Sequence, residues 1–148
     1  MSLNLLAAEA DIVARLTAKL ADQMPKVHVL TAADVAGVLQ EQQLTPAVHV
    51  VYSTSKVTEA RYDGKTARMA QTWLAVVVTR NARNLVSGSD ARNETGELAG
   101  AVFVALAGHK PASCSKPLIP VTPPGGGYSG GFAYLPLAFE TEIVISAP

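Results

Sequence analysis

The residue types that most often carry chemistry are few in this sequence, and they do not cluster. No two of the three histidines, His28, His49 and His109, lie within four residues of each other, and the single cysteine, Cys114, excludes a CxxC pair. Two metal ligands on one helix face need such short spacing. The sequence therefore predicts no metal site, and we interpret the histidines as solvated or packed imidazoles.

Cys114 is the one thiol that could act as a nucleophile. It lies between two serines, five residues after His109, without a nucleophile-elbow motif, and the chain contains no G-x-S-x-G. A catalytic nucleophile needs a base and an orienting carboxylate within reach. The pattern favours a loop thiol without a catalytic role. Because a lone cysteine cannot form an intrachain disulfide, it also favours an intracellular protein.

Glu140 and Glu142 have a spacing that could suit paired catalytic carboxylates. On a strand they share one face and are separated by about 6.6–7 Å of rise, a distance found in glycosidases. Alternating charges are also the ordinary solvation of an exposed strand face, and no aromatic platform for a sugar accompanies them. We interpret the two glutamates as a solvated strand face.

The richest glycine cluster, at residues 123–131, could in principle cradle a phosphate. It matches neither the P-loop pattern nor the G-x-G-x-x-G pattern of dinucleotide-binding loops. A predicted strand follows it, so no helix N-terminus is present to bind an anion. The cluster favours a flexible loop, and the sequence predicts no cofactor.

The elements that position these residues follow from apolar periodicity within a single predicted domain, residues 1–148. A stripe that includes Ile12 and Leu16 predicts a helix from about residue 5 to residue 23. Thr31 and Asp34 have capping-box spacing at the start of a second helix. The other predicted elements are short strands at 27–30 and 118–121, the second helix at 32–40, strands at 47–56 and 65–80 joined by a turn at Asp63–Gly64, a helix from 89 or 90 to about 107, and a strand at 132–145.

This order predicts an α+β domain with a mostly antiparallel sheet of about four strands and two main helices on one side. Residues 73–78 are apolar on both faces, which is typical of a central strand covered on both sides. The longest weakly polar run, at 98–108, is too short to span a bilayer. No repeat or interdomain linker divides the chain.

Composition narrows the function classes. The formal net charge is zero, which argues against a nucleic-acid or membrane-surface binder. Only 16% of residues are charged whereas 49% are hydrophobic, a balance that favours an oligomer. Residues 56–92 contain seven basic and three acidic residues (net +4), and the remainder contains five and nine (net −4). A basic surface on one copy could therefore dock on an acidic surface of another.

Three blocks of sequence together resemble a known family. They are residues 73–78 followed by Asn81, residues 96–111 with Gly96, Gly100 and Gly108, and residues 132–141. The combination resembles the Mu-like prophage family of small tail proteins, which is related to the tail-terminator (tail-completion) proteins of long-tailed phages. The N-terminal helix and the length agree, so the resemblance covers nearly the whole chain.

The resemblance implies an α+β structural protein that assembles as a ring, typically a hexamer, on the head-proximal end of the tail tube. Such a ring stops tube polymerisation and presents a face to head-completion proteins. It implies no catalytic site, metal or cofactor, and a location in the virion tail after assembly in the bacterial cytoplasm.

We hypothesise that charged and polar residues at two places form the subunit or ring contacts, and that the loop at 123–131 orders only on assembly. These residues are Arg80, Asn81, Arg83, Arg92, Glu140 and Glu142. Three alternatives stay open: another head–tail joining or minor tail protein, a small enzyme using Cys114 or the Glu140/Glu142 pair in a subunit cleft, and a binding module with a pocket beside the glycine loop.

Overall fold

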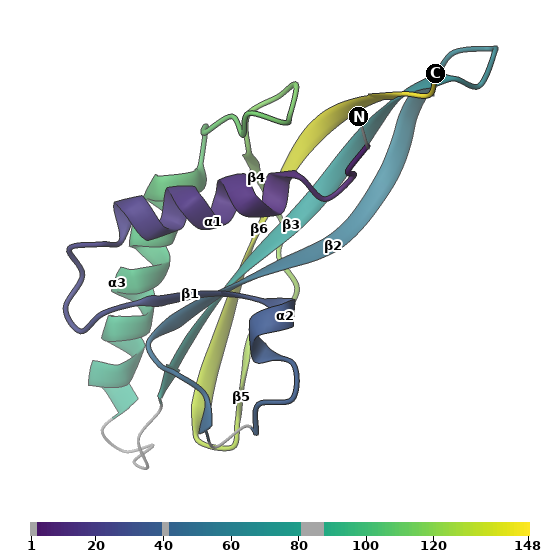
Figure 1. Ribbon diagram of the computed structural model, residues 1–148. Helices are drawn as coiled ribbons and strands as arrows, with labels where there is room; N and C mark the ends of the chain where they lie inside the picture. Colours follow the sequence, from purple (N-terminus) through teal and green to yellow (C-terminus); the bar gives the residue numbers. More distant parts are fainter. Residues whose placement is uncertain (1–2, 40–41, 81–87) are drawn as a thin grey trace.

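The computed structural model describes residues 3–39, 42–80 and 88–148, with the backbone alone for 88–93. In these residues three helices and six strands follow one another (Figure 1). Their bounds are α1 Ala8–Lys19, β1 His28–Thr31, α2 Ala32–Val35, β2 Ala47–Ala60, β3 Thr66–Arg80, α3 Gly88–Leu106, β4 Ile119–Val121, β5 Gly127–Ser129 and β6 Phe132–Ser146.

The six strands form one sheet in the order β1-β2-β3-β6-β4, with β5 also paired to β6. Only β1 and β2 run parallel, so the predicted antiparallel character is confirmed. The sheet is wider than the four strands expected, and residues 127–129 within the predicted glycine loop form β5. This strand was missed because three residues in a glycine-rich segment give no side-chain pattern, while the backbone pairs with β6 around a turn in which Gly130 and Gly131 have positive φ.

The main core lies on one face of the sheet, which we call the core-side face. Alternate residues of β3 and β6, such as Trp73 and Phe139, point to this face and pack in one cluster with α1 and α3. The helical stripe predicted for the N-terminus is confirmed, because Ile12 and Leu16 are buried in this cluster. Both main helices thus cover the same face of the sheet.

The opposite face, which we call the open face, carries a smaller cluster of Ala47, Val78 and Phe132 near one end. Leu74, in the middle of β3, is only half-buried on this face. The expectation that residues 73–78 are covered on both sides therefore holds near Val78 and fails around Leu74.

Two predicted helix boundaries and one turn depend on local backbone chemistry. The Thr31 N–H donates to the Asp34 carboxylate at 2.8 Å, as the capping-box spacing predicted. The helix that follows ends at Val35 instead of residue 40, because Ala36 is extended and Gly37 has a φ of 79°. The Asp63–Gly64 turn is confirmed, with the Lys65 N–H donating to the Asp63 side chain.

Strands β2, β3 and β6 are far longer than the helical layer needs. They contain 14, 15 and 15 residues, whereas globular strands usually contain about 5–6. Their distal halves project past α1 as a three-stranded extension that ends at the 61–65 turn (Figure 1). We call residues 55–70 and 142–146 the arm. None of the helices in the described part of the chain combines the length and apolar character that crossing a membrane requires.

Candidate assembly surface

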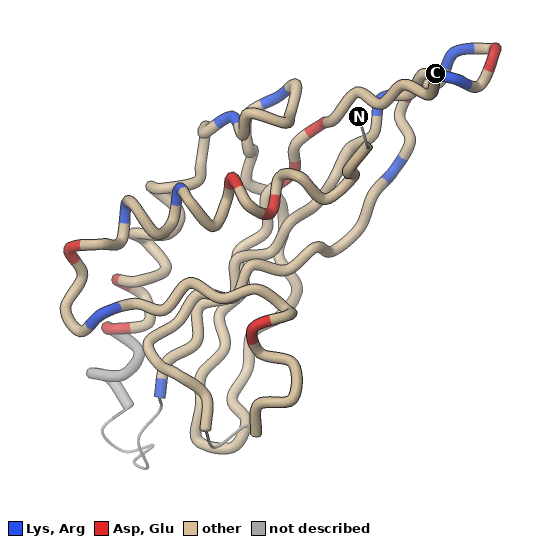
Figure 2. The backbone as a smooth tube through the Cα atoms, in the orientation of Figure 1, with Lys and Arg blue, Asp and Glu red and all other residues tan. Residues whose placement is uncertain are grey.

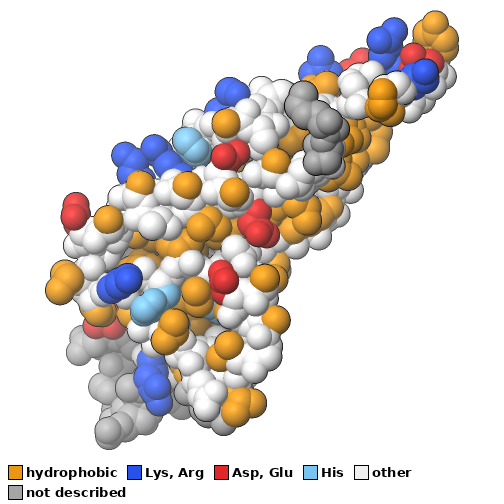
Figure 3. All heavy atoms as spheres, in the orientation of Figure 1, with side chains coloured by type: hydrophobic (Ala, Val, Ile, Leu, Met, Phe, Trp, Pro, Cys, Tyr) orange, Lys and Arg blue, Asp and Glu red, His pale blue; other side chains and the backbone are white. Residues whose placement is uncertain are grey.

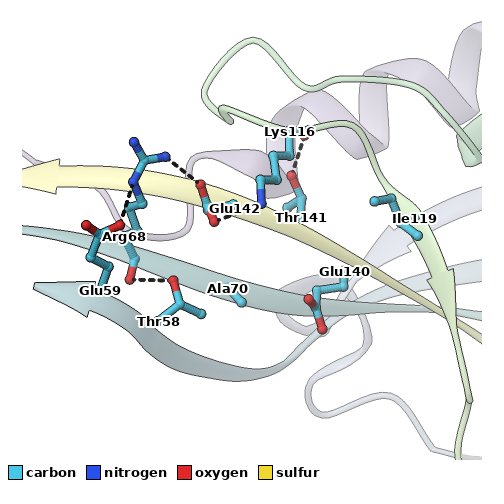
Figure 4. Close-up of a pocket in the computed structure, with 9 residues that line it drawn as sticks. All are labelled: Thr58, Glu59, Arg68, Ala70, Lys116, Ile119, Glu140, Thr141 and Glu142. Carbon is cyan, nitrogen blue, oxygen red and sulfur yellow. Dashed lines mark hydrogen bonds and ion pairs between the residues drawn. The ribbon is translucent and has the colours of Figure 1, made fainter.

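Glu142 lies at the base of the arm, at the centre of a charged cluster on the open face (Figure 4). Its Oε1 accepts from Arg68 Nη1 at 3.2 Å and from Ser115 Oγ at 3.2 Å, and its Oε2 lies 3.3 Å from Lys116 Nζ. Arg68 also pairs with Glu59 through a 3.3 Å contact between Nε and Oε2. The Glu142 side chain is only 8% exposed, so this carboxylate is a nearly buried anion between two cations.

Strand register and one loop bring these charges together. Antiparallel pairing places Arg68 opposite Glu59 on β2. On β6 it lies diagonally across from Glu142, which pairs with Ala70, two residues from Arg68. The loop that carries Ser115 and Lys116 is fixed by backbone contacts, because the Ser115 N–H donates to the Glu142 carbonyl at 2.7 Å. The cluster is therefore a product of the sheet and of a segment remote from it in sequence.

The electrostatics of Glu142 keep it ionised. Burial raises the pKa of Glu142, but hydrogen bonds from Lys116 and Arg68 and the charge of Lys116 outweigh this effect and hold its pKa below the ordinary value of 4.5. A general acid needs the opposite shift, toward neutral pH. The lowered pKa of Glu142 therefore fits an ion-pairing residue better than a proton donor.

A shallow groove of about 440 Å³ runs beside this cluster. Glu140 lies in it, exposed, on the same face as Glu142 (Figure 4). The residues that line the groove are Thr58, Glu59, Arg68, Ala70, Lys116, Ile119, Glu140, Thr141 and Glu142. Its polar, open character suits contact with another protein surface better than enclosure of a small ligand.

The ion pairs of Glu142 predict a pH-dependent stability. Because the folded-state pKa is lowered, the unfolded chain binds the proton more readily, so the stabilisation exists above about pH 4.5 and disappears as the pH falls through the folded pKa. We expect the Glu142→Gln variant to unfold at lower urea concentration than the wild type at neutral pH, with the difference shrinking at a pH well below 4.5. Glu140→Gln, on the same strand face, is the matched control and should leave the midpoint unchanged at both pH values.

The structure separates the predicted basic and acidic contact residues. Arg80 pairs with Phe132 on β6. Glu142 lies ten positions further along the same strand, so about 33 Å separates it from Phe132 at the rise of a strand. The Arg80 guanidinium lies 5.6 Å from the centre of the Phe132 ring, a cation–π contact that leaves the side chain exposed. Asn81 and Arg83 lie outside the described residues, and for Arg92 only its place in α3 is described.

Glu59, Arg68 and Lys116 are the members of the charged cluster that the sequence did not single out. Glu59 and Arg68 flank the predicted turn, so the hairpin register was a usable signal for their pairing. Lys116 had no such signal, because its approach to Glu142 depends on the path of the loop after α3.

The remaining candidates for chemistry are dispersed. Cys114 is buried in the main core cluster, and its carbonyl accepts from Lys110 Nζ at 2.9 Å. Burial lowers the pKa of His49, whose buried Nε2 has no hydrogen-bond partner in the described part of the chain. Among the side chains that the structure describes, in residues 3–39, 42–80 and 94–148, no three His, Cys, Asp or Glu gather closely enough to hold a metal ion.

Comparisons with known proteins identify a family and a similar fold. The family model of phage tail terminator proteins matches residues 1–147. A chain in the virion of a native gene transfer agent particle has a similar fold, with a TM-score of 0.53, 15% identity and 94% of each chain covered. A further solved structure is 12% identical over 99% of each chain, with a TM-score of 0.49. No curated protein matches the sequence.

The family match extends over all but the last residue of the 148. It agrees with the resemblance inferred from the sequence blocks at 73–81, 96–111 and 132–141. The chain therefore belongs to the phage tail terminator family and is a structural protein of the virion tail.

Proposed function

We propose that this protein closes the head-proximal end of the tail tube as a ring of identical copies, with six as the expected number. The ring stops addition of tube subunits and forms the joint to a head-completion protein. Assembly takes place in the bacterial cytoplasm before the tail joins the head. The observation that carries this proposal is the family match over residues 1–147.

The surface of the molecule supports self-assembly. Exposed apolar side chains occur at several separate places, including Val104 of α3, which is 77% exposed, and Tyr62 at the tip of the arm. Arg61 and Lys65 lie at the tip of the arm, whereas acidic residues lie on α3 (Figure 2). Separated surfaces of opposite charge fit a head-to-tail contact between copies.

The proposed mechanism is steric and electrostatic. One face of the ring matches the last ring of tube subunits, and the other face lacks the surface that a further tube subunit would need. Arg80 at one end of β3 and the Glu140/Glu142 region toward the other contribute to these contacts. No bond is made or broken in this mechanism.

The test is tube polymerisation with the tube protein of the same phage. Electron microscopy should show rings with a central hole for the protein alone at high concentration. Adding it to polymerising tubes should shorten them and leave a ring on one end only. Tubes that grow to the same length with and without the protein would point instead to another head–tail joining or minor tail protein.

A charge-reversal variant tests whether the basic segment, residues 56–92, contributes to association between copies. Light scattering of the Arg80→Glu, Arg83→Glu double variant should show at least about tenfold weaker association, a common effect of reversing contact charges. Lys26→Glu, an exposed site outside the basic segment, serves as the matched control. If the double variant associates as strongly as the wild type, the basic segment does not contribute to the subunit contact.

A further inference from the structure

The arm has two chemically different faces. Cross-strand pairing places Val57, Met69 and Ile143 on the core-side face, whereas Glu59, Arg68 and Glu142 lie on the open face. The charges of the open face are largely satisfied by one another. The arm is therefore amphipathic although the two main helices end before its tip (Figure 1).

The core-side face of the arm forms an apolar surface that the chain does not fully cover. Val57 is half exposed, and Leu3, which borders the distal end of β6, is 60% exposed. Hydrophobic side chains follow the arm toward its tip (Figure 3). We call this set the arm face: Leu3, Val57, Ala60, Ala67, Met69 and Ile145.

A second apolar surface lies on α3, away from the arm. Phe103 and Val104 are 44% and 77% exposed near the C-terminal end of the helix. Glu97 precedes Val104 by seven residues, two helical turns, so both side chains lie on the same helix face. Glu94 lies about one turn further toward the N-terminus and is also exposed.

The charges that accompany the two surfaces are complementary. Arg61 and Lys65 flank the turn at the tip of the arm with Asp63 between them, so the tip has a net charge of +1, and neither Arg61 nor Lys65 forms an ion pair within the described residues (Figure 2). The charged side chains described on α3 are both acidic, Glu94 and Glu97.

The spacings of charge and apolar surface agree as well. Arg61 follows Val57 by four residues, across a β-bulge and the end of β2, a span of at most about 13 Å at the rise of a strand. Glu97 and Glu94 lie about 10 and 15 Å along the helix from Val104. An arm laid along α3 can therefore place its basic tip on the acidic turns while its apolar face meets Val104.

We propose that the arm of one copy lies on α3 of the next copy, with the arm face against Phe103 and Val104 and the basic tip against Glu94 and Glu97. The inference deepens the proposed function, since it rests on assembly into a ring and assigns the surfaces that join its subunits. The two surfaces are different parts of the molecule, so the contact is heterologous and propagates head to tail until the ring closes.

Mixing two defective variants tests this contact directly. Val57→Asp removes the arm face and Val104→Asp removes the α3 surface, and each variant alone should associate at least about tenfold more weakly than the wild type. A mixture of the two retains one intact arm and one intact α3 surface. Native mass spectrometry should then show a heterodimer that grows no further.

Val38→Asp is the matched control, because Val38 is 44% exposed and belongs to neither the arm nor α3. It should associate like the wild type. Circular dichroism of each variant verifies the fold. A charge swap gives a second readout. The double variant Arg61→Glu, Lys65→Glu and the double variant Glu94→Lys, Glu97→Lys should each weaken association. A chain that carries all four substitutions should associate again.

The outcomes separate this inference from the proposed function. If Val57→Asp and Val104→Asp still form rings as the wild type does, or if Val38→Asp is as defective as Val57→Asp, the arm contact is overturned and the capping proposal stands. Head-to-tail association in a protein that leaves tube length unchanged would support the arm contact and overturn capping. A wild-type chain that stays monomeric even in the presence of tubes would overturn both.

Discussion

Replacing Trp73 with alanine is expected to reduce the free energy of unfolding by about 3–5 kcal/mol, the cost of deleting a large buried aromatic side chain. Trp73 is 2% exposed at the centre of β3 and packs in the main core cluster with both long helices. Its ring meets Tyr52 edge-on at 5.6 Å, and its Nε1 donates to Gln71 Oε1 at 3.3 Å. The variant therefore loses apolar burial, an aromatic pair and a buried hydrogen bond at once.

Urea denaturation followed by circular dichroism measures this effect, since Trp73 is the only tryptophan and its fluorescence is lost in the variant. Leu74→Ala, on the adjacent position of the same strand, removes a half-buried side chain from the open face and should cost about 1 kcal/mol. Equal losses for the two variants would contradict the assignment of the core to one face of the sheet.

The second large effect is expected from Leu16→Ala in α1, at about 2–5 kcal/mol. Leu16 is fully buried between α1 and the sheet, and α1 has no side-chain cap at its N-terminus. An isolated helix of this length is marginal in water. Its stability must therefore come from the buried stripe that Leu16 completes.

Leu6→Ala is the matched control, because Leu6 precedes the same helix and is 45% exposed. It should change the free energy of unfolding by less than about 1 kcal/mol. Thermal denaturation of both variants gives the comparison. A Leu16→Ala loss no larger than that of Leu6→Ala would mean that α1 is not held by its apolar stripe.

The elements of the fold that could be predicted are those with a strong local signal. The stripe of Ile12 and Leu16 and the Asp63–Gly64 turn each depend on residues close in sequence, and both are confirmed. The alternation predicted for β6 holds only in part, because Leu135 is exposed and Glu142 of the predicted outer face is buried. The helix predicted to reach residue 40 was too long, since apolar spacing does not reveal the positive φ of Gly37. Strand β5 was missed because backbone pairing with β6 forms it without a side-chain pattern.

The candidate site was predictable only in part. The face shared by Glu140 and Glu142 follows from strand alternation, but the difference in their exposure and ion pairing does not. Glu142 is enclosed by Arg68 and Lys116 whereas Glu140 stays exposed. The basic excess of residues 56–92 was visible in the sequence, yet Arg61 and Arg80 lie at opposite ends of the strands that carry them.

The sequence by itself determined the class of the protein, its helices and long strands, and its family, since composition, periodicity and motif blocks are properties of neighbouring residues. Tertiary structure alone decided how far the long strands project beyond the helices and which charges meet at Glu142. Those contacts join segments remote in sequence, 26 residues apart for Lys116 and Glu142 and 74 apart for Arg68 and Glu142. Local residue patterns carry little information about such distant pairings, because the register of the whole sheet must form before the two side chains can meet.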